Sequence, residues 1–438
     1  MKRARCDGAL IHAGELVVGL APGSPVIGPG LALERYDDGA VAWLDGEVVD
    51  AGPTDEVLAE WEPDEAEDAS HRLVTAGLID AHTHLVWGGD RADEFAERSQ
   101  GATYESIAKR GGGILATVRA TREATDPILL ERASTSARRM LSCGTTTIEA
   151  KSGYDLTQDG ELRLLRIAHE AGRATGLGVI GTALPAHALP PEYAGRRDAY
   201  LNEVCVPVVL EAHDRGHAHF ADMFVDEGTF TPTEAHRYAR AVKAAHVGLR
   251  LHVDQLRDGG GAALAAELGA LSADHLDYSS EAGLAALAAA GTTAVLTPGA
   301  TLTLGGPSPR LAALRAHHVP TAIATDFNPG TSTVDSLVLC LALACRLYHM
   351  TPEEAFVGAT ESAARSLGQA GRIGCLRPGA DADVVLWEAP DVRTLSYHFG
   401  PAWAHSVYRR GRRVPGTGPS HVSSATPTAF PSIGGGAA

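Results

Sequence analysis

The feature that most constrains the fold is a regular alternation of short apolar runs and helical patterns beyond about residue 71. The apolar runs lie at 76–84, 145–151, 178–185, 220–225, 249–252, 271–275, 293–297 and 321–326. Helical patterns separate or follow them at 104–124, 126–142, 159–175, 199–214, 232–246, 261–268, after Ser280, at 310–317 and at 334–348. Such alternation implies a parallel sheet, and eight repeats favour an α/β fold of the closed (β/α)₈ TIM type. An open, doubly wound sheet is the competing arrangement, but no Gly-x-Gly-x-x-Gly follows an early strand.

Both ends of the chain show β patterns instead. Runs at 15–20 and 40–49 resemble small hairpins, with Asp45-Gly46 as a turn, and similar runs return at 383–387 and 406–411. We therefore expect a small β-sandwich domain assembled from residues 1–70 and 371–414. The residues between them, 71–370, are expected to form the barrel. The Gly-, Ser- and Pro-rich residues 415–438 are expected to be a disordered tail.

Composition excludes several classes of partner. The formal net charge of −17 argues against nucleic acid and against an anionic membrane surface. The six cysteines are scattered without a Cys-x-x-Cys pair, which indicates reduced thiols in a cytoplasmic protein. We find neither a signal peptide nor an apolar run long enough to span a membrane.

His82 and His84 stand at the end of the first barrel strand. Residues two apart on a strand point to the same side, so both imidazoles would face one spot beyond the strand end. An ordinary His-rich turn is the alternative interpretation of this pair. The other strand ends decide between the two.

Polar side chains that carry chemistry recur at those strand ends. They are His82 and His84, Lys151, His187, Asp226 and Glu227, His252, His275, and Asp326. Active sites of such barrels lie at the carboxyl ends of the strands. One histidine alone is usually a core residue, but several at matching positions on separate strands predict a functional site.

Three of the histidines and one aspartate form a candidate metal site. His82, His84, His252 and Asp326 offer ligands that suit Zn²⁺ or Fe²⁺ with a position left for water. A bound metal can lower the pKa of water toward about 7 and so provide a nucleophile at neutral pH. Asp326 can contact both metal and water, which makes it the natural proton acceptor. His275 is placed to orient water or to polarise a carbonyl.

These residues resemble the pattern of the amidohydrolase superfamily and, within it, the imidazolonepropionase family. The resemblance covers roughly residues 70–410. The segments that carry it are Asp80 to Arg91, Gly111-Gly112-Gly113-Ile114, Lys151-Ser152-Gly153-Tyr154, Ala186-His187-Ala188 and Ala324-Thr325-Asp326-Phe327-Asn328-Pro329-Gly330.

The resemblance implies a function and a site. The implied reaction is hydrolysis of 4-imidazolone-5-propanoate, a small anionic heterocycle, to N-formimidoyl-L-glutamate in histidine degradation, by a homodimer with one Zn²⁺ or Fe²⁺/Fe³⁺ per chain. Metal ligands would be His82, His84, His252 and Asp326, and Asp326 and His275 would be catalytic. Substrate contacts would be Arg91, Tyr154, His187, Gln255, Asn328, Gly330 and Thr331. Arg91 could clamp the propionate in bidentate fashion.

Two departures and three alternatives bear on this interpretation. Asp155 stands where the family pattern leads us to expect Gly, and Gln255 stands where related deaminases carry Glu. Because Gln cannot exchange a proton, Gln255 argues against the alternative of a one-metal purine or pyrimidine deaminase. A binuclear hydrolase of another cyclic amide would need a carboxylated Lys at the end of strand four, whereas Lys151 closes strand two. A non-catalytic scaffold should have lost ligands that this chain keeps.

Overall fold

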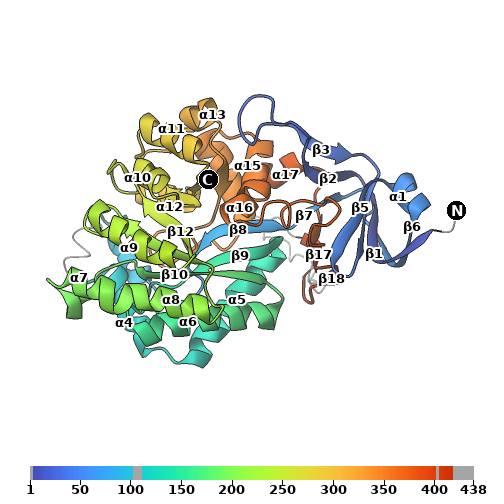
Figure 1. The fold of residues 1–438 in the computed structure, drawn as a ribbon. Helices are drawn as coiled ribbons and strands as arrows, with labels where there is room; N and C mark the ends of the chain where they lie inside the picture. The colour runs from blue at the N-terminus through green and yellow to red at the C-terminus, as the bar shows by residue number, and fades with distance from the viewer. Residues whose placement is uncertain (1–2, 102–110, 401–403, 418–438) are drawn as a thin grey trace, which may run out of the picture.

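The computed structural model describes residues 3–101, 111–400 and 404–417 (Figure 1). The helix expected at 104–124 falls partly outside the described residues, which show α4 (Ile114–Glu123) in its second half. Most of the expected tail, 418–438, also lies outside them.

An eight-stranded parallel sheet forms the centre of the molecule. Its strands are β8 (Leu78–Thr83), β9 (Thr145–Lys151), β10 (Gly178–Ala186), β11 (Phe220–Val225), β12 (Gly248–Val253), β13 (Ser272–His275), β14 (Thr293–Leu296) and β15 (Thr321–Ile323), paired in chain order. Backbone bonds join its first and last strands: His84 N donates to Phe327 O at 2.9 Å and Asp326 N to His82 O at 3.0 Å. The predicted (β/α)₈ barrel is confirmed, and the open sheet is wrong.

Helices surround the barrel (Figure 1). They are α2 (Ala92–Ser99), α4, α5 (Asp126–Ser142), α6 (Gln158–Thr175), α7 (Arg197–Tyr200), α8 (Val206–Asp214), α9 (Pro232–Ala244), α10 (Gly261–Glu267), α11 (Glu281–Ala290), α12 (Pro298–Leu304), α13 (Leu311–Ala316), α14 (Leu337–Leu343), α15 (Pro352–Gly358) and α16 (Glu361–Ser366). The helix expected at 199–214 is interrupted by a π-helical turn, Leu201–Cys205. Pro207 lacks an N–H for the α-helical ladder, which accounts for the wider turn before it.

Two further sheets lie beside the barrel and share a second apolar core. One contains β1 (Ala4–Ala13), β4 (Gly39–Leu44), β5 (Glu47–Pro53) and β6 (Trp61–Asp68), with α1 (Thr54–Glu60) following β5; the other contains β2 (Glu15–Leu20), β3 (Leu33–Tyr36), β7 (Leu73–Ala76), β16 (Val384–Trp387), β17 (Ala404–Arg409) and β18 (Arg412–Arg413). Leu10 and Val41 of the first sheet pack in one cluster with Leu16, Val74 and Leu386 of the second. Strands from both chain ends therefore form one sandwich, as predicted. Between β16 and β17 lies the short helix α17 (Val392–Tyr397).

The apolar run expected as the first barrel strand, 76–84, lies mostly in β8, but its first residue, Ala76, ends a separate strand, β7. β7 pairs with β2 and β16 of the sandwich, whereas β8 belongs to the barrel. Gly77 separates them, and a Cβ there would lie only 2.1 Å from Thr146 Oγ1. A glycine is therefore required where the chain passes from one sheet to the other.

The predicted turn at Asp45-Gly46 is observed, with φ of +53° and +81°. Across the described parts of the chain, none of the helices has the length and apolarity needed to cross a bilayer.

Candidate metal centre and active site

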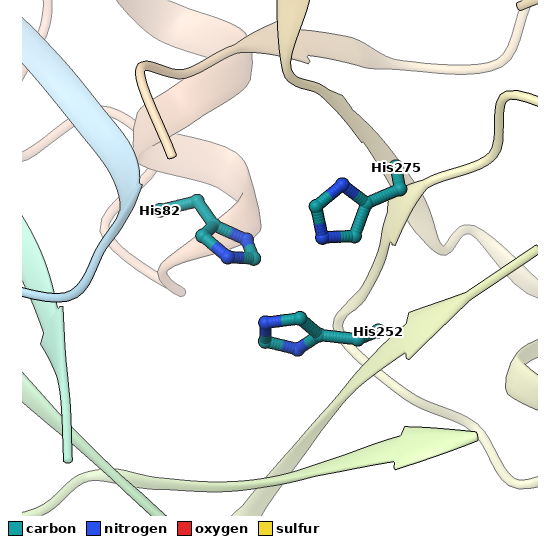
Figure 2. Close-up of side chains that lie close together, drawn as sticks. All are labelled: His82, His252 and His275. Carbon is teal, nitrogen blue, oxygen red and sulfur yellow. The ribbon is translucent and has the colours of Figure 1, made fainter. Parts of the chain in front are cut away.

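Histidines from several strands converge at the carboxyl end of the barrel. His82 comes from β8, His252 from β12 and His275 from the end of β13, and their rings face one another (Figure 2). The centroid of the His82 ring lies 4.4 Å from that of His252 and 5.2 Å from that of His275. Their nitrogens lie close enough together to hold one ion, with ligand atoms within 4.8 Å of each other.

Asp326 and His84 complete the predicted set. Asp326 Oδ1 lies 3.3 Å from His82 Nε2 and 3.7 Å from His84 Nε2. Asp326 lies three residues beyond the end of the last barrel strand, β15, and adopts φ of +50°, and His275 has φ of +80°. Non-glycine residues in this region are uncommon and cluster at functional sites. The structure thus brings together all four predicted ligands and His275.

Burial sets the charge of this cluster. Removal from water lowers the pKa of His82, His84 and His275 well below the ordinary value, so these imidazoles are neutral and have a lone pair to offer. Burial raises the pKa of Asp326 well above its usual range. A nearby cation would favour the ionised carboxylate and offset that cost.

The residues fit a divalent cation. Buried ring nitrogens without a hydrogen-bond partner among the described residues include His82 Nε2, His84 Nδ1 and His252 Nε2. Buried polar atoms left unsatisfied are costly, and a metal ion would satisfy those that face it, among them His82 Nε2, which lies 3.3 Å from Asp326 Oδ1. Three imidazoles with a carboxylate are a donor set that Zn²⁺ and Fe²⁺ both accept.

Below the histidines lies a charged layer of five residues with fully buried side chains: Glu149, Lys151, Asp222, Arg250 and Asp274. Sequence reasoning singled out Lys151 and missed the other four. Lys151 Nζ lies 2.8 Å from both Glu149 Oε1 and Asp222 Oδ2. A signal was available, because Glu149 and Arg250 stand two residues before Lys151 and His252 on the same strands. Residues two apart share a face, so polar residues there also point inward.

Arg91 is held in place by a carboxylate and a glycine. Its side chain is 9% exposed, and Nε donates to Glu94 Oε2 at 2.8 Å. Glu94 Oε1 accepts from Gly113 N at 2.8 Å, which ties the Gly-Gly-Gly segment to the same carboxylate. A Cβ at Gly330 would lie 2.1 Å from Arg91 Nη1. Arg91 therefore packs directly against the Gly330 backbone.

The turn at 328–331 links Arg91 to the metal cluster. Asn328 Oδ1 accepts from the N–H groups of Gly330 and Thr331 at 2.7 and 2.8 Å. Its Nδ2 donates to Asp326 O at 2.6 Å and to Thr331 Oγ1 at 2.8 Å. Thr331 Oγ1 lies 3.3 Å from Asp326 Oδ2. The Asn328 amide is thus used within the turn, whose shape it maintains.

Tyr154 and His187 line the cluster on the side of His84. The His187 ring stacks on that of His84, with 4.9 Å between the ring centroids and 16° between the ring planes. The Tyr154 ring centroid lies 5.2 Å from that of His187. Burial lowers the pKa of His187 to about 3, which keeps the ring neutral. The Tyr154 loop is held by Glu161, a buried residue of α6 that sequence reasoning also missed. Its carboxylate accepts from the N–H groups of Gly153, Asp155 and Leu156 at 2.6–2.8 Å.

The polar residues after β11, the fourth barrel strand, do not join the histidine cluster as those of β8 and β12 do. Asp226 Oδ2 accepts from the backbone of Gln255 at 2.7 Å, and Glu227 pairs with Arg257, so both stabilise a loop instead of joining the histidines. Phe224, near the end of β11, has its ring centroid 5.7 Å from that of His252. Gln255 is nine-tenths buried beside this loop.

Comparison with known proteins places the chain in a family. The family model described as "Amidohydrolase family" matches residues 73–414. An imidazolonepropionase of Hahella chejuensis is 44% identical over 352 residues, 80% of this chain and 87% of that protein, and one of Cupriavidus pinatubonensis is 46% identical over 382 residues, 87% and 89%. A solved adenosine deaminase from Xanthomonas campestris with bound zinc shares the fold, with a TM-score of 0.68 at 19% identity over 94% of this chain and 93% of that one. The chain belongs to the imidazolonepropionase family of the amidohydrolases.

Proposed function

We propose that this chain hydrolyses 4-imidazolone-5-propanoate to N-formimidoyl-L-glutamate, a step of histidine degradation. The observation that carries the proposal is that one segment, 326–331, which includes the turn at 328–331, contacts both halves of the site. Asp326 at its start borders the histidine cluster, and Gly330 near its end packs against Arg91. A site with metal ligands beside a sheltered guanidinium suits a small ring with a carboxylate arm.

Binding of the substrate is assigned to residues around that turn. Arg91 would bind the propionate, with Glu94 fixing the direction of the guanidinium and Asn328 maintaining the backbone at Gly330 and Thr331. Tyr154, His187 and Gln255 would contact the polar edge of the ring. The neutral state of His187 lets one ring nitrogen accept a hydrogen bond, since Nδ1 lies 3.1 Å from Gly153 O and donates to it.

Proton transfer is assigned to Asp326 and His275. A divalent cation, when bound by His82, His84, His252 and Asp326, would supply Lewis acidity and lower the pKa of water toward about 7. The water oxygen bonds to the ring carbonyl carbon while Asp326 accepts its proton. His275, oriented by a 2.9 Å contact between Nδ1 and Thr297 Oγ1, stabilises the negative charge on the former carbonyl oxygen. The ring C–N bond then breaks, and the same proton passes to the leaving nitrogen.

We further propose that one ion, Zn²⁺ or Fe²⁺, suffices. The end of β11, the fourth barrel strand, carries no lysine. Lys151 of β9, the second barrel strand, is already paired with two buried carboxylates. An ammonium bonded in this way keeps its proton, because Asp222 and Glu149 raise the pKa of Lys151 despite its burial. Carboxylation, which a bridging lysine requires, needs a neutral amine.

A direct assay tests the proposal. Purified protein is incubated with imidazolone propionate, its ultraviolet absorbance is followed, and metal is measured in the same sample. We expect loss of absorbance without ammonia release and about one ion per chain. Ammonia release from purines or pyrimidines, with the imidazolone unchanged, would instead support the deaminase alternative. Full activity in a preparation stripped of metal would refute the scheme.

A further inference from the structure

Two of the histidines in the cluster contact aspartates of the charged layer through their Nδ1 atoms. His82 Nδ1 lies 2.7 Å from Asp274 Oδ2 and donates to it, which leaves Nε2 free to point toward Asp326. His252 Nδ1 lies 3.0 Å from Asp222 Oδ2, a short contact that is less well aligned than the first. The proton of a neutral imidazole is drawn to the nitrogen that faces a carboxylate, so each contact leaves a lone pair on Nε2.

Lys151 connects these two aspartates. Its Nζ lies 2.8 Å from Asp222 Oδ2 and 3.5 Å from Asp274 Oδ2, the same oxygens that face the two histidines. One buried ammonium therefore bridges the supports of two rings that come from opposite parts of the barrel, β8 and β12.

The remaining members of the charged layer keep this arrangement rigid. Arg250 Nη2 lies 3.3 Å from Asp274 Oδ2 and donates to Ala81 O at 2.8 Å, next to His82 in the chain. Ser272 Oγ donates to the second oxygen of Asp274 at 2.6 Å. Ion pairs this deeply buried gain little net stability over apolar residues, because desolvating the charges is costly. A layer of this kind is better explained by the geometry that it imposes.

We propose that Lys151, Asp222 and Asp274 are positioning residues for the metal site. Asp274 and Asp222 fix the tautomer and ring orientation of His82 and His252, and Lys151 sets the spacing of both carboxylates at once. The inference rests on the proposed function only in requiring that these histidines bind a metal. It gives Lys151, at the end of strand two, a role that does not involve bridging two ions.

The test compares three isosteric variants: Asp222→Asn, Asp274→Asn and Glu149→Gln. The first two remove the charge that faces a histidine, and an amide can donate its own N–H to Nδ1 and so favour the wrong tautomer. Glu149→Gln is the matched control, because Glu149 contacts Lys151 at the same 2.8 Å and, within the described part of the chain, pairs with no histidine ring. Affinity for Zn²⁺ is measured by chelator competition, and the visible spectrum of the Co²⁺-loaded protein reports ligand geometry.

We expect affinity for Zn²⁺ to fall about 10–100-fold in Asp222→Asn and Asp274→Asn, with altered Co²⁺ spectra. Glu149→Gln should lower the melting temperature to a similar degree yet change Zn²⁺ affinity by less than about threefold. Equal loss of affinity in all three variants, or parental affinity in the first two, would overturn the proposal.

A charge-balanced variant covers the case in which a single substitution prevents folding. Asp222→Asn combined with Lys151→Met removes one buried charge of each sign, and it should fold while still binding Zn²⁺ weakly. Parental affinity in this double variant would also overturn the proposal. None of these measurements uses substrate, so a chain that binds zinc as expected but does not hydrolyse imidazolone propionate would refute the proposed function alone.

Discussion

The inside of the barrel contains two polar layers that differ in how completely their atoms are satisfied. In the upper layer, His82, His84 and His252 each leave a buried ring nitrogen without a hydrogen-bond partner among the described residues. In the charged layer below, every carboxylate has partners: Glu149 and Asp222 bind Lys151, and Asp274 binds Arg250, Ser272 and His82.

Burial disfavours charge in both layers, yet the two layers end in different charge states. In the upper layer, burial prevails and lowers the pKa of His82, His84 and His275, which stay neutral. In the charged layer, burial alone would raise the pKa of Asp222 and Asp274, but nearby cationic groups hold both below the ordinary value. Unsatisfied ring nitrogens identify the layer that awaits a ligand, and paired carboxylates identify the layer that supports it, although Arg250 Nε in that layer also lacks a partner among the described residues.

The largest expected effect is on the upper layer. His252→Ala removes a metal ligand, so we expect metal content and turnover to fall together, with kcat lower by at least about 1,000-fold. Metal analysis and ultraviolet assay on one sample test this. His398→Ala, at an exposed residue after α17, is the control and should leave both unchanged. Retained turnover in His252→Ala would separate this histidine from the reaction.

The next effect concerns the charged layer. Lys151→Met leaves Asp222 and Glu149 buried without their shared cation, so the free energy of unfolding should fall by about 3–5 kcal/mol. The midpoint of urea denaturation, measured on metal-free protein, reports this loss separately from metal binding. Metal-free His252→Ala, by comparison, should unfold at a midpoint much closer to that of the parent. A midpoint unchanged in Lys151→Met would mean that the two layers do not differ as described.

Much of this architecture follows from periodicity. The eight strand ends could be predicted because apolar runs of the right length alternate with helical patterns, and His82, His252 and Asp326 then fall at matching positions. The split at Gly77 could not, because β7 and β8 form one continuous apolar run whose halves join different sheets. The division of the chain at residues 71, 371 and 415 stays a prediction.

The supporting residues were harder to predict than the site residues. Glu161 binds three backbone N–H groups of the neighbouring loop, and Asp274 binds His82, which lies 192 residues away in the sequence. An acidic residue within a strand or helix gives no local sign of such partners. For Asn328 the sequence suggests a role that its contacts do not support. Its position beside Asp326 suggests a ligand contact, yet its amide is occupied within the turn.

Substrate binding should depend on a guanidinium rather than on charge alone. Arg91→Lys keeps the positive charge but loses the planar fork and the Nε–Glu94 bond, so we expect kcat/KM to fall about 10–100-fold, mainly through KM. Metal content should not change, which distinguishes this variant from His252→Ala. A KM equal to that of the parent would remove Arg91 from the site.

Gly330→Ala tests the same contact from the other side. The φ of Gly330 lies outside the left-handed region, so alanine does not strain the backbone, but its Cβ would lie 2.1 Å from Arg91 Nη1. Displacement of Arg91 should raise KM about tenfold, as loss of one charged hydrogen bond would. Gly52→Ala, where a Cβ comes no closer than 3.9 Å to its neighbours, is the control. Unchanged KM in both variants would show that Arg91 relaxes without cost.

The smallest effect is expected at Gln255. An amide cannot exchange a proton at neutral pH, so Gln255 can contribute only binding, and Gln255→Ala should raise KM by about three- to tenfold, the cost of one neutral hydrogen bond, while kcat stays near the parental value. The backbone N–H of residue 255 still reaches Asp226 in the variant, so the loop should keep its place. Steady-state kinetics with imidazolone propionate separate the two constants. A large fall in kcat would instead mean that this side chain orients the reacting groups, and its role could no longer be described as binding alone.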